Sequence, residues 1–184
     1  MITKWIVPLL AAGTLLAGEC TYRIADAEIT WEAFKTPAKT GVQGTFGNVK
    51  LSAMPDKSEK GLIEGAKAVI DTASIDSKNR GRDAKLVKAF FQVQGVDRIE
   101  AVITRVRDGW VDLNITMNGI TKEVPMKSET DEREMEAKGW IDLGDFDMLP
   151  SLASLNKACY KKHAGKTWQD VALEFKLKTI KKCR

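Results

Sequence analysis

The sequence predicts an all-β domain, an antiparallel sheet of about eight strands closed into a barrel with one or two short helices. Apolar and polar residues alternate along 111–117 and 168–180, as in strands with one buried and one solvated face. Asn118-Gly119 lies between two such runs and favours the positive φ angles of a two-residue hairpin turn. A barrel is favoured because closure protects the sheet edges, although a two-sheet sandwich fits the pattern nearly as well.

The other strands follow from β-branched content and turn signals. In the first strand Ile29 and Trp31 share one face, and Thr30 and Glu32 share the other. Asp108-Gly109 interrupts a long apolar run and marks a second tight turn. The predicted strands are 22–34, 44–53, 66–76, 98–117, 122–130, 133–146 and 168–180, of which 98–117 is divided by the turn.

Two segments have helical spacing of apolar residues. The first is 77–91, and Asp76 or Ser77 is expected to cap its start. The second is 150–165, which has a proline ahead of it and Gly165 behind it as start and stop signals.

The first 18 residues have the properties of a secretory signal peptide. Lys4 precedes a twelve-residue apolar run, 5–16, which is too short to span a bilayer comfortably, and small residues follow it. The alternative is a buried N-terminal helix or strand. The sequence therefore predicts a signal peptide at 1–18, a single domain at 19–184, and a periplasmic or secreted mature chain.

Three cysteines leave the redox state open. An exported chain meets an oxidising compartment, so a disulfide between Cys20 and Cys183, near the two chain ends, is favoured. Cys20 also follows a run similar to a lipoprotein signal, with Glu19 where a small residue is expected. A lipidated Cys20 would anchor the protein to a membrane and leave Cys159–Cys183 as the pair.

Composition argues against several functional classes. A net charge of +4 is too small to indicate a nucleic-acid partner, and no Cys-x-x-Cys spacing or histidine cluster indicates a metal or cofactor. The aspartates 76, 83, 145 and 147 are interpreted as cap and turn residues rather than paired catalytic acids. No nucleophile–base constellation can be assembled, so we expect no enzyme. The rival expectation is a hydrolase or redox protein that uses Cys159 or His163.

Five motifs in one order resemble a known family. They are "YRIADAEITWEAF" (22–34), "GVQGTF" (41–46), "IDTASIDSKNRGRDAKL" (70–86), "MNGITKEV" (117–124) and "GDFDM" (144–148). Together they resemble the YceI-like, polyisoprenoid-binding, lipocalin-like domain over nearly all of the mature chain. The resemblance implies an extended antiparallel eight-stranded lipocalin-like barrel around an apolar tunnel. It also implies a small exported carrier that binds, and transports or stores, an isoprenoid, an isoprenoid quinone or a fatty-acid-like amphiphile.

By pattern alone the inward-facing apolar residues would pack on one another, and the resemblance implies instead that they line the tunnel. A filled barrel would favour the alternative function, a non-enzymatic stress-related or surface interaction module. The partners considered besides the lipid are a membrane surface and a second copy of the chain. The predicted ligand-binding residues are Trp31, Val111, Leu113, Ile115, Val171, Leu173, Phe175 and Leu177.

The ends of the strands carry residues that a tunnel mouth would use. Trp110, Trp140 and Trp168 are expected at the mouth or, equally, as ordinary core residues. A basic rim of Lys35, Lys39, Arg80 and Arg82 would suit an acidic headgroup or an anionic lipid surface, although solvated side chains are the simpler expectation. The segment 150–167 is the candidate gate.

Overall fold

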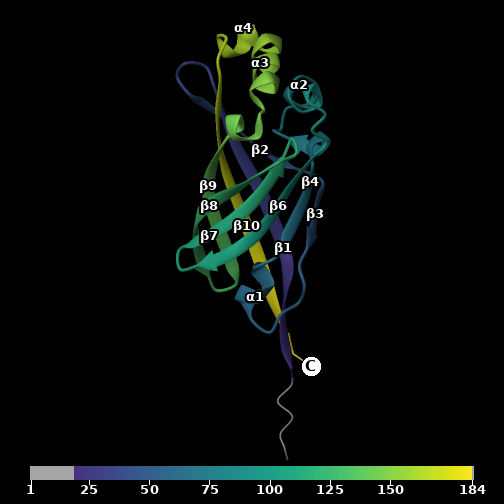
Figure 1. Cartoon of the computed structure of the whole chain (residues 1–184), viewed down its shortest axis with the longest axis vertical. Helices are drawn as coiled ribbons and strands as arrows, with labels where there is room; N and C mark the ends of the chain where they lie inside the picture. Colours follow the sequence, from purple (N-terminus) through teal and green to yellow (C-terminus); the bar gives the residue numbers. More distant parts are fainter. Residues whose placement is uncertain (1–18, 184) are drawn as a thin grey trace, which may run out of the picture.

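A computed structural model describes residues 19–183, so the expected signal peptide lies outside the described residues. All strands belong to one antiparallel sheet, which is strongly curled (Figure 1), and the sandwich alternative is therefore wrong. The sheet order is β3-β4-β6-β7-β8-β9-β10-β1-β2-β5. The strands are β1 Cys20–Lys35, β2 Thr40–Phe46, β3 Val49–Ser52, β4 Lys67–Asp71, β5 Ile75–Asp76, β6 Arg98–Arg107, β7 Trp110–Met117, β8 Ile120–Asp131, β9 Glu134–Asp142 and β10 Thr167–Cys183.

The all-β curled fold confirms the predicted class, but the sheet has ten strands where eight were expected. The difference arises because two predicted strands, 44–53 and 66–76, are each interrupted, giving β2 with β3 and β4 with β5. Across the interruption Gly47 N donates to Ser74 O at 2.9 Å and Asp71 N donates to Asn48 O at 3.1 Å. These bonds continue the pairing of β2 with β5 into that of β3 with β4, and so bring the two ends of the strand order together.

Helices occupy mainly one end of the elongated molecule, where α2 (Arg80–Ala89), α3 (Leu149–Ala158) and α4 (Tyr160–His163) lie together (Figure 1). The predicted cap of the first helix was wrong: the side chain of Asn79, not Asp76 or Ser77, accepts from Arg82 N at 2.9 Å. The second predicted helix is divided at Cys159 into α3 and α4. The helix α1, Glu59–Ile63, was not predicted, because its five residues are too few to show a helical period.

The two described ends of the chain lie side by side at the opposite end of the molecule (Figure 1). There the long strands β1 and β10 pair antiparallel, with Cys20 opposite Cys183. The two cysteines form a disulfide, which is the pairing favoured by the sequence, while Cys159 is a free and buried thiol.

The hairpin at Asn118-Gly119 has the predicted geometry. Both residues have positive φ angles, 53° and 74°, and they connect Met117 with its partner Ile120. The Asn118 side chain also donates to the carbonyl of Phe146 at 3.0 Å. The turn therefore joins β7 to β8 and also holds the short helical turn that follows β9.

Replacing Gly119 by alanine is expected to lower the free energy of unfolding by about 1 kcal/mol, because a Cβ is disfavoured at positive φ. A Cβ added at Gly119 would meet no other atom within 4 Å, so the loss would come from the backbone alone. The matched control is Gly81→Ala in α2, which is expected to raise the free energy of unfolding by about 0.5 kcal/mol. Urea melts of the two variants measure both values, and equal signs would contradict the argument.

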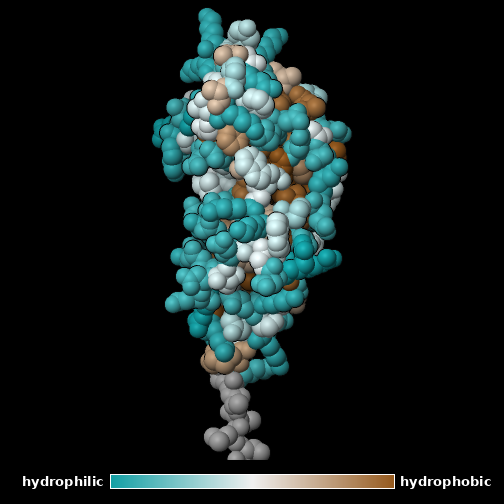
Figure 2. All heavy atoms as spheres, turned by 90° about the vertical axis from the view of Figure 1, so that its left-hand side faces the viewer, coloured by the Kyte–Doolittle hydropathy of each residue, from teal (hydrophilic) through white to brown (hydrophobic). Residues whose placement is uncertain are grey.

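The outer face of the sheet is polar, and Figure 2 shows a mostly hydrophilic surface on which hydrophobic residues are exposed mainly in the upper half. On that face Lys138 and Lys176 both lie within ion-pairing distance of Glu136 and Glu174 across β9 and β10. Among residues 19–183, none of the helices combines the length and the apolar character needed to cross a bilayer.

Candidate ligand cavity

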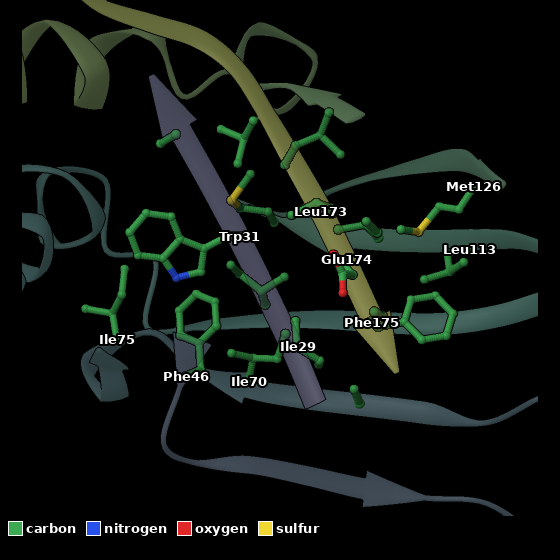
Figure 3. A pocket seen from close by; sticks show the side chains of 18 of the residues that line it. Ile29, Trp31, Phe46, Ile70, Ile75, Leu113, Met126, Leu173, Glu174 and Phe175 are labelled. Carbon is green, nitrogen blue, oxygen red and sulfur yellow. The ribbon is translucent and has the colours of Figure 1, made fainter. Parts of the chain in front are cut away.

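A cavity of about 200 Å³ lies inside the curled sheet. This volume is far larger than the roughly 10–15 Å³ that one water molecule needs. Almost all of its lining residues are apolar, and the polar ones are Lys67, Thr167, Glu174 and Lys176. The charged ends of Lys67, Glu174 and Lys176 are paired with other charged groups of the sheet. In the close-up, Trp31, Phe46 and Ile75 gather on one side of the cavity, and Leu113, Met126 and Phe175 on the other (Figure 3).

Seven of the eight residues predicted to bind a ligand line this cavity, and Val111 does not. Val111 is fully buried beside the β6–β7 turn, where it lies between Val106 and Met126 in the sheet. It belongs to the buried hydrophobic core, as the alternation predicted, but not to the part of the core that borders the cavity. The seven lining residues are Trp31, Leu113, Ile115, Val171, Leu173, Phe175 and Leu177.

Small side chains explain why the interior contains a cavity. A barrel of this size can be filled by its own side chains or left open for a ligand, depending on side-chain volume. Five alanines contribute to the lining, and each presents only a methyl group where a larger residue would occupy the space. They are Ala27, Ala33, Ala66, Ala68 and Ala101.

The wall formed by β4 and β6 was not predicted, because these strands lack a long clean alternation. Ile24 was not predicted either; it lies on β1, where the β1–β10 register shifts between Ile24 and Asp26. Such a β-bulge shifts the side-chain phase by one residue, so Ile24 and Ala27 both face the cavity although they are three positions apart. The apolar lining residues that β4 and β6 add are Ala68, Ile70, Ile99, Ala101 and Ile103.

Trp31 lies at the junction between this cavity and a second recess. Its indole Nε1 donates to the carbonyl of Thr45 at 3.4 Å, and the ring lies close to Gly44 of the neighbouring strand. A Cβ at Gly44 would stand 2.4 Å from Cζ2 of the indole. Glycine is therefore required here for the close approach of the tryptophan ring.

The second recess has a volume of about 320 Å³ and adjoins the apolar cavity, with which it shares Trp31, Ala33, Leu86, Leu155 and Thr167. It lies beneath the helical end, since α2, α3 and α4 all contribute to its walls. Its basic lining defines what we call the basic mouth: Lys35, Arg82, Lys85, Lys162 and His163.

Of the four residues expected to form a basic rim, Lys35 and Arg82 line the mouth. Lys39 does not, because its ammonium pairs with the Asp170 carboxylate at 2.6 Å and lies 5.0 Å from the centre of the Trp168 ring. Arg80 is exposed and also lies outside the mouth. Lys85, Lys162 and His163 were not predicted, because only the tertiary fold brings α2 and α4 next to the end of β1.

The three tryptophans expected at the mouth have different positions. Trp168 lines the apolar cavity, and its indole donates to the carbonyl of Thr36 at 2.8 Å. Trp140 is largely exposed and stacks on Phe34 with ring centres 5.7 Å apart. Trp110 is also exposed on the outer surface and lines neither space. None of the three lines the basic mouth, and Trp168 alone lines the interior cavity.

The aspartates have structural roles. Asp83 accepts from the backbone N–H of Ser77 at 2.9 Å, and Asp76 accepts from the backbone N–H of Lys78 at 2.7 Å. Asp147 adopts a left-handed conformation at the end of a short helical turn. Within residues 19–183 no cluster of three or more histidine, cysteine or acidic residues could hold a metal ion.

His163 is the titratable group of the mouth with a shifted pKa. Burial and the positive charges of Lys35, Lys85 and Lys162 lower the pKa of its imidazole, and its Nδ1 lies 2.9 Å from the Thr167 hydroxyl. At neutral pH the ring is therefore uncharged in the folded protein.

Lowering the pH from 7.5 to 5 is expected to destabilise the protein through His163. The pKa in the folded state is below the ordinary value of about 6.5, so the unfolded chain binds the proton more readily. The contribution of the neutral His163 ring to stability is fully present above about pH 6.5. It is lost as the pH falls from about 6.5 toward the lower pKa of the folded state. Urea melts of the wild type and His163→Gln test this. The free energy of unfolding of the wild type minus that of the variant should become smaller in acid, because only the wild type has the histidine to protonate. A difference that is independent of pH would contradict the assignment.

Comparison with known proteins agrees with this architecture. The family model described as the YceI-like domain matches residues 22–179. A sequence comparison with curated proteins gave no significant match.

Several solved structures share the fold at low sequence identity. A polyisoprenoid binding domain from Saccharophagus degradans, implicated in plant cell wall breakdown, superposes with a TM-score of 0.60 at 10% identity, covering 88% of this chain and 98% of that one. BcnA from Burkholderia cenocepacia superposes with a TM-score of 0.56 at 15% identity, covering 84% of this chain and 96% of that one. The YceI protein of Campylobacter jejuni gives 0.52 at 14% identity, covering 79% and 86%. At these identities the likeness establishes the fold alone.

Proposed function

The chain belongs to the YceI-like family, and from this premise we propose that it binds one long-chain apolar ligand inside the curled sheet. The ligand class is an isoprenoid, an isoprenoid quinone or a fatty-acid-like amphiphile. The observation that carries the proposal is the apolar cavity, which remains open because alanines stand where larger side chains would fill it. The match to a polyisoprenoid binding domain in fold supports the same ligand class.

Burial of the chain supplies the binding energy. Each buried methylene contributes roughly 0.8 kcal/mol, so ten carbons offer about 8 kcal/mol before the costs of association. Apolar walls provide this energy without directional contacts, which suits a flexible hydrocarbon chain. The protein then replaces a membrane for one molecule, and it transports or stores the ligand rather than reacting with it.

The carrier is proposed to work outside the cytoplasm. The apolar segment at residues 5–16 supports export, and so does the Cys20–Cys183 disulfide, because disulfides persist in oxidising compartments. The disulfide also bears on the lipoprotein alternative. A sulfur that carries a lipid thioether is not available for a disulfide, so Cys20 has one of the two modifications in any one molecule.

Native mass spectrometry of the exported protein, followed by solvent extraction of its lipids, tests the proposal. A discrete co-purifying mass that extraction identifies as an isoprenoid or a fatty-chain compound is the expected result. A bare mass that does not change after incubation with such lipids would overturn the carrier function and favour an interaction module with a closed interior. The same spectrum distinguishes a disulfide from an acylated Cys20.

A further inference from the structure

The basic mouth adjoins the apolar cavity, so a chain bound in the cavity with one end at the shared residues would place its headgroup beside the mouth. Trp31, Ala33, Leu86, Leu155 and Thr167 line both spaces, so the two lie directly next to each other across these side chains. The character of the walls changes at this junction. The residues around the cavity are almost all apolar, whereas those around the mouth include several cations and no carboxylate.

The lysines of the mouth are not neutralised by the protein. Across residues 19–183, no ion pair within 4.0 Å includes Lys35, Lys85 or Lys162. Lys39, at the same end of the molecule, does pair with Asp170. Arg82 is held at the recess by donating to the hydroxyl and the carbonyl of Ser77 at 2.7 and 2.6 Å.

The three ammonium groups act on a common region. They come from different elements, Lys35 from β1, Lys85 from α2 and Lys162 from α4, yet all three lower the pKa of His163. Like charges that converge on a half-buried recess repel one another, and an anion placed among them would relieve this repulsion. Charge-assisted hydrogen bonds from ammonium groups to anionic oxygens are also among the stronger polar contacts in proteins.

We propose that the ligand carries an anionic headgroup, a carboxylate or a phosphate, which Lys35, Lys85 and Lys162 bind in the basic mouth while the chain occupies the apolar cavity. This inference rests on the proposed function, because it concerns one end of the same ligand. The concave, half-buried setting of Lys35 and Lys85 favours a single headgroup over an extended membrane surface.

Pairs of probes with one chain and two headgroups test the inference on the delipidated full-length mature protein. Hexadecanoic acid is compared with hexadecanol, and geranylgeranyl phosphate with geranylgeraniol. The anion is expected to bind roughly tenfold more tightly than the alcohol in at least one pair, and added salt should reduce that preference. The pair that shows the preference distinguishes a carboxylate from a phosphate.

Two double variants with equal charge change locate the effect. Lys85→Gln with Lys162→Gln removes two cations of the mouth and should reduce the preference for the anion at least roughly fivefold, with the affinity for the alcohol unchanged. Lys88→Gln with Lys161→Gln removes two exposed lysines from the same helices, outside the mouth, and should leave the preference within about twofold of the wild type. Lys85→Arg with Lys162→Arg keeps the charge and should retain the preference.

A second readout uses the single histidine of the chain. Binding of hexadecanoic acid should raise the pKa of His163 in NMR titrations, because the anion offsets the charges of Lys35, Lys85 and Lys162, which face the ring together with the Thr167 hydroxyl. Binding of hexadecanol should not raise it. The shift should become smaller in Lys85→Gln with Lys162→Gln.

The outcomes separate this inference from the proposed function. Equal affinity for acid and alcohol in both pairs overturns the anionic headgroup and leaves the carrier intact. Absence of binding by all four probes overturns the carrier itself. If Lys85→Gln with Lys162→Gln and Lys88→Gln with Lys161→Gln lose the preference for the anion equally, the preference arises from overall charge and the headgroup site is wrong. If the mouth variant weakens sedimentation with phosphatidylglycerol vesicles but not the preference for the anion, the lysines face a membrane and the inference is wrong.

Discussion

Replacing Ala101 by phenylalanine is expected to weaken the binding of geranylgeraniol by roughly two orders of magnitude while the fold is retained. Ala101 lies on β6 between Ala68 of β4 and Ile115 of β7, and its methyl group faces the apolar cavity. A phenyl ring there would occupy the space of about four methylene groups of the ligand. At ~0.8 kcal/mol per methylene the loss is about 3 kcal/mol, or roughly 200-fold in Kd.

The stability of Ala101→Phe should change by less than about 1 kcal/mol, because the ring enters existing space instead of displacing packed side chains. Unchanged stability with reduced binding separates a blocked cavity from a damaged fold. Calorimetric titration with geranylgeraniol and urea melts measure the two quantities.

Ala172→Phe provides the matched control. Ala172 stands on β10 between Val171 and Leu173, which line the cavity, but it does not line the cavity itself. Its cross-strand partners are Glu32 and Trp140 on the neighbouring strands. Binding should remain within about twofold of the wild type, because an apolar addition outside the cavity takes no space from the ligand. Wild-type affinity in Ala101→Phe, or equal losses in both variants, would place the ligand elsewhere.

Removing the disulfide with Cys20→Ser and Cys183→Ser is expected to lower the free energy of unfolding by about 3–5 kcal/mol. The bond closes a loop of 163 residues, so it restricts almost the whole unfolded chain. For a domain of this size the melting temperature should fall by roughly 6–20 °C. The variant should still fold, because β1 and β10 remain paired along most of their length.

The wild type in a reducing agent is the control for this variant, since it loses the bond without a substitution. Its melting temperature should fall to that of the double variant, and the reducing agent should not affect the double variant further. If the wild type melts at the same temperature with and without reductant, the bond is either absent in solution or contributes nothing to stability.

Local patterns in the sequence were sufficient to predict most of the strands and their faces. Side chains alternate along a strand by backbone geometry, so the runs at 111–117 and 168–180 identified inward-facing residues without any knowledge of their neighbours. The turn at Asn118-Gly119 was equally local, because its φ angles depend on those two residues. These signals were enough for the fold class and for most of the predicted cavity lining.

Alternation identifies the buried face of a strand, but it does not determine whether that face encloses space. Val111 and Leu113 share one pattern, yet Leu113 lines the cavity and Val111 lies in the filled core. The difference depends on what stands across the interior at each depth, and hence on strand register and on small residues such as Ala68 and Ala101 from other strands. Packing is a property of neighbours, so a single segment does not record it.

The sequence by itself therefore determined the strands, the tight hairpin and the inward-facing apolar residues, because each depends on the backbone of a few consecutive residues. The tertiary structure alone decided three other features: the interruption of two strands, the phase shift in β1, and the basic mouth assembled from β1, α2 and α4. Lys35, Lys85 and Lys162 are far apart in the chain. Only the curl of the sheet beneath its helices brings their charges together, and local patterns carry no information about such distant approaches.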